Sequence, residues 1–195
     1  MAPELWSIDM EVPFFELHRD WKIISRLTSQ VTYFRVHGIH SYWHPQSPFL
    51  GIPHGRQLRL LDLSNVVLEW NSPRLSGLIV LRLDCLLRNQ LSRSHLTKIL
   101  QMSPGLEELT FSSIRLQTES EGDFVGSNII SLPSLKSFKL TSVDSSFNEL
   151  LPLLRMPATA TIDLDGADIR DLTVGDDPLI FRVIPPVLPS APCIA

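Results

Sequence analysis

The feature that most constrains this chain is a recurring apolar pattern, L-x-x-L-x-L. The chain has 32 leucines among its 195 residues. An excess of leucine arises from long helices or from repeats, and periodicity separates the two. Seven copies of the pattern, four close and three looser, begin at residues 5, 31, 58, 78, 106, 135 and 159. This regular spacing indicates repeats, with one short strand in each copy.

A small residue stands two positions after the last apolar anchor in six of the seven copies. These residues are Gly38, Asn65, Cys85, Ser113, Ser142 and Gly166. A large side chain would clash where the chain turns tightly after a short strand, so such positions favour small residues. The next residue is apolar in the same six copies and is expected to point back into the core. The pattern therefore predicts short strands that each end in a tight turn.

The segments between the predicted strands change to the spacing of amphipathic helices. Their apolar stripes lie in residues 14–24, 96–100 and 147–154. Ser146 and Glu149 have the spacing of a capping box at the start of the last stripe. Pro152 predicts that this last helix is short or kinked. Residues 71–77 have no helical pattern, and we expect an extended segment or a turn there.

Strands and helices that alternate every 20–29 residues are typical of a leucine-rich-repeat solenoid, in which each unit packs its apolar stripe against its neighbours. We therefore expect an α/β fold with a curved parallel sheet of about six or seven short strands, backed by helices and turns. This domain is expected to span residues 1–170. Residues 171–195 carry five prolines between Pro178 and Pro192. They are expected to form a poorly ordered tail or a truncated repeat.

Pro3, Leu5, Trp6 and Ile8 stand near the start of the chain in the segment PELWSIDM. This segment resembles the P-x-LW-x-x-I end of the F-box in fungal, basidiomycete-type proteins that join an F-box to leucine-rich repeats, with one residue fewer between Trp and Ile. The segments LLDLSNVVLEWNSPRLSGLIVLRL and SPGLEELTFSSI resemble the repeat region of the same proteins. The resemblance covers roughly residues 3–166 and implies the substrate-recognition region of a ubiquitin-ligase adaptor. Because so few residues precede Leu5, we expect the F-box, and with it binding to a Skp-type adaptor, to be absent.

Alternate residues of parallel strands point to one face of the sheet, here the predicted concave face. The fifth position of each copy forms a row across that face: Asp9, Arg35, Asp62, Arg82, Thr110, Lys139 and Asp163. Two hypotheses stay open for this row, a ladder of cross-strand ion pairs and a surface that binds a partner. The candidate partner-binding residues are Tyr33, Arg35, Leu60, Asp62, Arg82, Glu108 and Lys139, because aromatic, aliphatic and arginine side chains are expected to adjoin there.

Three histidines, His37, His40 and His44, stand close together in the segment HGIHSYWH. Histidine nitrogen suits zinc, so they are weak candidates for a metal site. No cysteine or carboxylate that could complete such a site lies close in sequence. A polar connecting loop is the simpler interpretation, and we expect neither a metal nor another cofactor.

Cys85 and His95 could be imagined as a nucleophile and its base. Cys85, however, occupies the small turn position, where cysteine behaves as a small hydrophobic residue. The chain has no nucleophile-elbow, phosphate-loop, zinc-protease or dinucleotide motif. The sequence therefore predicts a non-enzymatic protein-interaction module. The alternatives are a small metal-binding protein or enzyme that uses the histidine loop, and a truncated product without independent function.

Composition narrows the class of partner. The formal charge of −4 has the wrong sign for a nucleic-acid binder driven by overall charge. No apolar run approaches the roughly 18 residues of a membrane span. Two cysteines cannot form a disulfide framework, and no secretory signal is visible, so we expect an intracellular protein, cytoplasmic or nuclear. The expected partner is a protein of unknown identity that binds the concave face.

Overall fold

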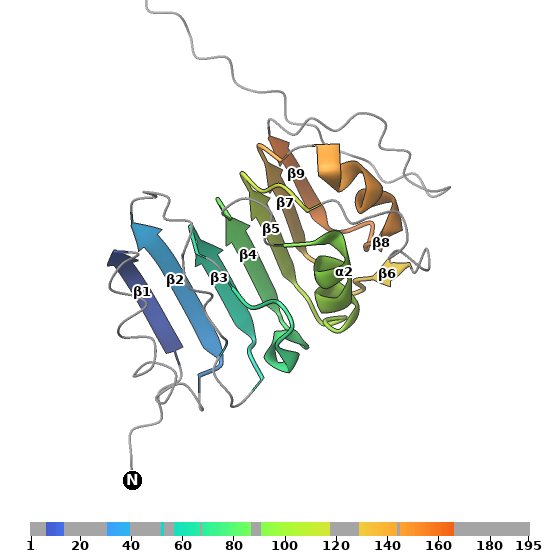
Figure 1. Cartoon of the computed structure of the whole chain (residues 1–195). Coiled ribbons are helices and arrows are strands. Elements are labelled where there is room, and N and C mark those ends of the chain that lie inside the picture. The colour runs from blue at the N-terminus through green and yellow to red at the C-terminus, as the bar shows by residue number, and fades with distance from the viewer. Residues whose placement is uncertain are drawn as a thin grey trace, which may run out of the picture.

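The fold is known from a computed structural model, which describes residues 7–13, 31–39, 52, 57–66, 68–86, 91–117, 129–143 and 145–165. Over these ranges the chain forms an α/β fold with one seven-stranded parallel sheet and few helices. The strands are β1 (Ser7–Pro13), β2 (Tyr33–Ile39), β3 (Leu60–Ser64), β4 (Val80–Asp84), β5 (Glu108–Ser112), β7 (Ser137–Thr141) and β9 (Thr161–Asp165). They lie side by side in chain order (Figure 1).

The register of the sheet is uniform from β1 to β9. Asp9, Arg35, Asp62, Arg82, Thr110, Lys139 and Asp163 are successive partners across the seven strands. The row predicted from the apolar pattern is therefore confirmed, as is the parallel direction of the strands. A uniform register keeps every strand's apolar residues on the same face, because side chains alternate between the two faces.

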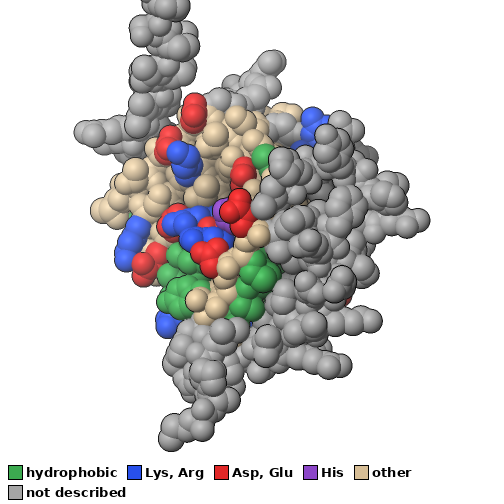
Figure 2. Space-filling model, turned by 90° about the vertical axis from the view of Figure 1, so that its left-hand side faces the viewer, with side chains coloured by type: hydrophobic (Ala, Val, Ile, Leu, Met, Phe, Trp, Pro, Cys, Tyr) green, Lys and Arg blue, Asp and Glu red, His purple; other side chains and the backbone are tan. Residues whose placement is uncertain are grey.

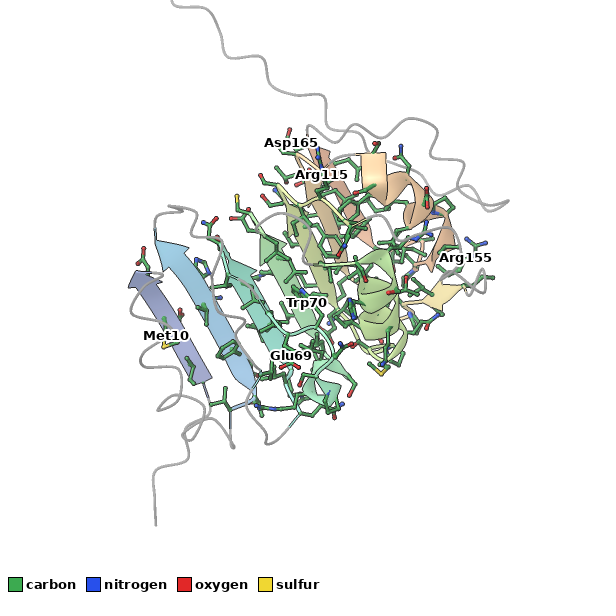
Figure 3. All side chains as sticks on the ribbon, viewed as in Figure 1. Met10, Glu69, Trp70, Arg115, Arg155 and Asp165 are labelled. Carbon is green, nitrogen blue, oxygen red and sulfur yellow. The ribbon has the colours of Figure 1, made fainter. Side chains whose placement is uncertain are left out.

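One face of the sheet forms the core. The strand residues that point to it are almost all buried: Ile8, Phe34, Val36, Leu61, Leu63, Leu81, Leu83, Leu109, Phe111, Phe138 and Leu140. Trp70, between β3 and β4 in the chain, belongs to the same core and is labelled in Figure 3. On β9 the equivalent residues, Ile162 and Leu164, are only partly buried. The described helices also contribute side chains to this core, so they cover the same face.

The helix α2 (Arg93–Gln101) confirms the helical stripe predicted at residues 96–100. Ser92 caps the first turn of α2, because its hydroxyl accepts a hydrogen bond from the backbone N–H of His95. Leu96, Ile99 and Leu100 are buried in the core cluster. The helix ends at Gln101, shortly before Pro104. This end is expected, because the residue before a proline disfavours helical geometry.

The stripe at residues 147–154 forms two short 3-10 helices rather than an α-helix: η3 (Ser145–Glu149) and η4 (Leu151–Leu153). Pro152 cannot donate a backbone hydrogen bond, which limits a continuous helix. The predicted capping box is also wrong, because η3 begins at Ser145 and Ser146 lies inside it. The Ser146 hydroxyl accepts a hydrogen bond from the N–H of Leu116, at 3.0 Å. Ser146 thus ties η3 to the turn that follows β5.

Two further elements lie outside the main sheet. The strands β6 (Ile130–Ser131) and β8 (Leu154–Arg155) pair in a second, two-stranded sheet. The segment 71–77, predicted to be extended or a turn, contains the 3-10 helix η2 (Pro73–Leu75). A buried arginine of η2, Arg74, donates a hydrogen bond to the carbonyl of Val31 at 2.8 Å, which fixes η2 against the start of β2.

The same turn follows four consecutive strands of the sheet. Its first residue has a left-handed backbone in each case: Asn65, Cys85, Ser113 and Ser142, with φ between 45° and 54°. The N–H of each of these residues donates to the carbonyl of the last residue of the next strand: Asp84, Ser112, Thr141 and Asp165. The next residue is buried at all four turns, at Val66, Leu86, Ile114 and Val143. The small residues at these four positions are therefore explained by backbone conformation. Gly38 differs from them, because it lies within β2, and the tight turn predicted at that position is wrong.

Several predictions lie outside the described residues. These are the helix at residues 14–24, the tail at 171–195 with its boundary at residue 170, and three of the four residues that begin the F-box resemblance, Pro3, Leu5 and Trp6. In the ranges that the structure describes, none of the helices combines the length and the apolar character needed to cross a membrane.

Candidate interaction surface

The face of the sheet opposite the core is called the open face here. It is formed by three residues from each strand, which align in three rows across the sheet. Figure 2 shows blue and red side chains interleaved in the middle of this face, with a purple histidine among them and green apolar side chains directly below. The candidate residues Tyr33, Arg35, Leu60, Asp62, Arg82, Glu108 and Lys139 all lie on this face.

Asp62 is the centre of the charged row. One of its carboxylate oxygens, Oδ2, lies 3.0 Å from Nε of Arg35 and 3.5 Å from Nη1 of Arg82. Its other oxygen, Oδ1, lies 3.5 Å from Nε2 of His37. The Asp62 side chain is only 12% exposed, far less than the side chains around it. A shielded carboxylate held between two guanidinium groups strengthens both ion pairs, because water screens them less.

Arg35 joins β1 to β3 across the sheet. It donates from Nε to Asp62 and from Nη1 to Asp9, both at 3.0 Å. The hydrogen bond to Asp62 is the largest cause that raises the pKa of Arg35, which therefore stays charged. Arg35 is thereby held in one orientation on the open face.

Arg82 makes its closest contacts diagonally, with Glu108 on β5. Its Nε and Nη2 donate to the two oxygens of the Glu108 carboxylate, at 2.6 and 2.9 Å. This two-bond geometry is the strongest form of an arginine–carboxylate pair. The hydrogen bonds raise the pKa of Arg82 and lower the pKa of Glu108. At the far end of the row, Lys139 pairs with Asp163 at 2.9 Å.

The row nearest the start of the strands carries the apolar part of the open face. Tyr33, Leu60 and Val80 are register partners on three neighbouring strands. Tyr33 is 46% exposed, while Leu60 and Val80 are partly exposed. These three side chains form a small apolar patch beside the fixed charges of the middle row.

The row at the end of the strands is acidic. Glu11, Asp84 and Asp165 lie on β1, β4 and β9 in this row. Asp84 accepts a hydrogen bond from the Ser64 hydroxyl at 3.1 Å. Within the part of the chain that the structure describes, none of the three carboxylates forms an ion pair. The L-x-x-L-x-L pattern places these residues on the open face, but they are not among the predicted binding residues.

The histidine and cysteine candidates have different outcomes. His37 lies beside Asp62 on the open face, whereas His40 and His44 lie outside the described residues. Among the residues with described positions, no three His, Cys, Asp or Glu side chains are arranged to hold a metal ion. Burial and the neighbouring Asp84 raise the pKa of the Cys85 thiol, which disfavours the reactive thiolate.

His95 lies between Ser92 and Asn71 in a chain of hydrogen bonds. Its Nδ1 is 2.8 Å from the Ser92 hydroxyl, and its Nε2 is 3.0 Å from the Asn71 side-chain oxygen. The order of groups is that of a nucleophile, a base and an orienting residue. Ser92, however, is buried and its hydroxyl caps α2. The chain of hydrogen bonds therefore stabilises the start of α2.

Comparisons with protein-family models, with curated proteins and with solved structures find no match for this chain. The open face itself is therefore the basis on which a function is proposed.

Proposed function

We propose that this chain is a non-enzymatic protein-interaction module that binds its partner on the open face. Its architecture would be a leucine-rich-repeat solenoid, similar to the substrate-recognition region of fungal F-box and leucine-rich-repeat adaptors of ubiquitin ligases. The uniform register and the turn that recurs after four strands support a solenoid. The resemblance of the segment PELWSIDM supports the more specific assignment.

The observation that carries the proposal is the pairing of exposed apolar groups with charges that are already fixed. Tyr33 and its neighbours Leu60 and Val80 offer apolar area to a partner. Beside them Arg35 and Arg82 are held by carboxylates on adjacent strands. Groups fixed before binding lose little conformational entropy when a partner docks. Aromatic and arginine side chains are also those most often found at the energetic centre of interfaces.

A peptide-display library selected on the immobilised protein tests the proposal. Dissociation constants of the enriched peptides are then compared for the wild type, Tyr33→Ala and Ile129→Ala. Ile129 is the matched control, because it is 58% exposed and lies outside the main sheet.

We expect Tyr33→Ala to weaken binding by about tenfold and Ile129→Ala to leave it unchanged. The proposal is contradicted if no enriched peptide distinguishes Tyr33→Ala from Ile129→Ala. The library is not restricted in peptide charge, so the result does not depend on whether the bound peptides are basic, neutral or acidic.

A further inference from the structure

The negative charge of the chain is concentrated on the open face. The three rows contain seven carboxylates, at Asp9, Glu11, Asp62, Asp84, Glu108, Asp163 and Asp165, and three cationic side chains, at Arg35, Arg82 and Lys139. With His37 neutral the face has a formal charge of −4, equal to that of the whole chain. The remainder of the chain is therefore neutral on balance.

The positive side chains of the open face are already engaged. Arg35 pairs with Asp9 and Asp62, Arg82 pairs with Glu108, and Lys139 pairs with Asp163. The charge in excess belongs to the acidic row, on Glu11, Asp84 and Asp165. A ligand that lies on this face therefore meets a balanced middle row and an apolar patch on one side of it. On the other side it meets carboxylates that form no ion pair with any residue whose position is described.

The spacing of the acidic row excludes one shared cation. Glu11 and Asp84 are three strands apart in the sheet, and so are Asp84 and Asp165. Neighbouring strands lie about 4.8 Å apart, so each gap is about 14 Å. A metal ion binds carboxylate oxygens at about 2.0 to 2.6 Å and cannot bridge such a gap. The three carboxylates call for separate cationic groups on one extended ligand.

From this arrangement, and resting on the proposed function, we infer that the partner presents an extended basic segment with lysine or arginine at every fourth residue. An extended chain rises about 3.4 Å per residue, so four residues span about 14 Å, the distance between the acidic side chains. Residues four apart also point to the same side of an extended chain. Residues of the opposite parity point to the other side, toward Tyr33, Leu60 and Val80, and would be apolar.

The rows themselves fit such a segment. Successive rows are two residues apart along each strand, about 7 Å. A backbone that runs over the middle row, across the strands, can therefore reach the acidic row with long basic side chains and the apolar patch with leucine-sized ones. The negative face disfavours nucleic acids and anionic lipid surfaces as occupants, because both repel its carboxylates.

Fluorescent nine-residue peptides test this inference on the full chain. The probe has lysine at its first, fifth and ninth positions, leucine at its second and fourth, and serine or glycine elsewhere; it is made in both sequence directions. One control replaces the lysines with glutamate, and another keeps the composition but places the three lysines together. Binding is measured by fluorescence anisotropy for the wild type, Asp84→Asn, Asp165→Asn and Glu69→Gln. Glu69 is exposed and lies beside Trp70, away from Asp165 (Figure 3).

We expect the spaced-lysine peptide to bind in one direction, and to bind more tightly than both controls. Asp84→Asn and Asp165→Asn should each weaken it by about two- to fivefold, and Glu69→Gln should not. The inference is overturned if the glutamate or clustered peptide binds as tightly, if the spaced peptide does not bind, or if Glu69→Gln has the same effect. Enrichment of neutral or acidic peptides that require Tyr33 would also overturn it, while leaving the proposed function intact.

Discussion

Arg82 and Glu108 face each other diagonally across β4 and β5, with two parallel N–H···O bonds of 2.6 and 2.9 Å. The pair fixes a guanidinium group in the middle of the open face. It also shows that a register row does not decide which charges pair, because Asp62, the neighbour of Arg82 in its row, is more distant at 3.5 Å.

Replacing Arg82 by lysine should separate geometry from charge. Lysine keeps the positive charge but cannot form two parallel hydrogen bonds with the Glu108 carboxylate. We expect Arg82→Lys to lower the free energy of unfolding by about 0.5 to 1 kcal/mol in urea denaturation. The matched control is Arg59→Lys, because Arg59 is exposed and lies just before β3. This substitution should change the free energy of unfolding by less than about 0.5 kcal/mol. Equal effects of the two substitutions would show that the two-bond geometry contributes no stability.

Acid should remove the contribution of Glu108. The hydrogen bonds from Arg82 lower the pKa of Glu108 below its ordinary value of 4.5. The folded state therefore binds the proton less readily than the unfolded state. Its stabilisation is complete above about pH 5 and is lost as the pH falls through the lowered pKa.

Urea denaturation of the wild type and Glu108→Gln at about pH 7 and about pH 3 measures this loss. At the higher pH we expect the wild type to have a larger free energy of unfolding than Glu108→Gln. At the lower pH this difference between the two proteins should shrink. Glu69→Gln removes an exposed carboxylate elsewhere and serves as the comparison. A difference for Glu108→Gln that persists undiminished in acid would contradict the linkage to Arg82.

Gly38 lies near the end of β2 and packs closely against Asn65, the first turn residue after β3. A Cβ added there would lie 2.7 Å from the carbonyl oxygen of Asn65. We expect Gly38→Ala to lower the free energy of unfolding by about 1 to 3 kcal/mol, because backbone atoms must move to relieve the contact. Gly105→Ala is the control, since nothing lies within 4 Å of the added atom. If both substitutions have the same effect on the urea midpoint, this contact is not the reason for glycine at position 38.

The left-handed turn residues make a second stability prediction. Ser113 has a φ of 51°, and a β-branched side chain is strained in that conformation. We expect Ser113→Val to cost about 1 to 2 kcal/mol in thermal or urea unfolding. The same substitution at Ser112, which lies in the extended strand β5, should be nearly neutral because valine favours strands. A larger loss at Ser112 than at Ser113 would contradict the conformational explanation.

The sequence predicted the strands and their register because those depend on a local apolar pattern that recurs. Leu61, Leu81 and Leu109 face the core in their strands. Because side chains alternate along a strand, this also determines which residues of each strand lie on the open face. The stripe that ends at Leu154 was predicted as a helix, yet Leu154 pairs in β8 with Ile130, a partner 24 residues away. Such a pairing leaves no periodic signal.

The candidate site was predictable as a face but not as a set of contacts. The alternation of side chains placed Asp62, Arg82 and Glu108 on one surface. Arg82 lies closer to Glu108 than to Asp62 because of the side-chain rotamers, and the spacing of residues in the sequence does not encode rotamers. Likewise, the acidic residues of the third row gain their importance only once the nearer carboxylates are known to be paired with Arg35, Arg82 and Lys139.

The most direct test of binding on the open face is an NMR titration of the isotope-labelled full chain with an enriched display peptide. We expect the largest amide shift changes in β2, β3 and β4, at residues 33–37, 60–64 and 80–84. The largest changes in α2 or in η3 and η4, with those strands unaffected, would contradict the assignment of the open face as the binding surface.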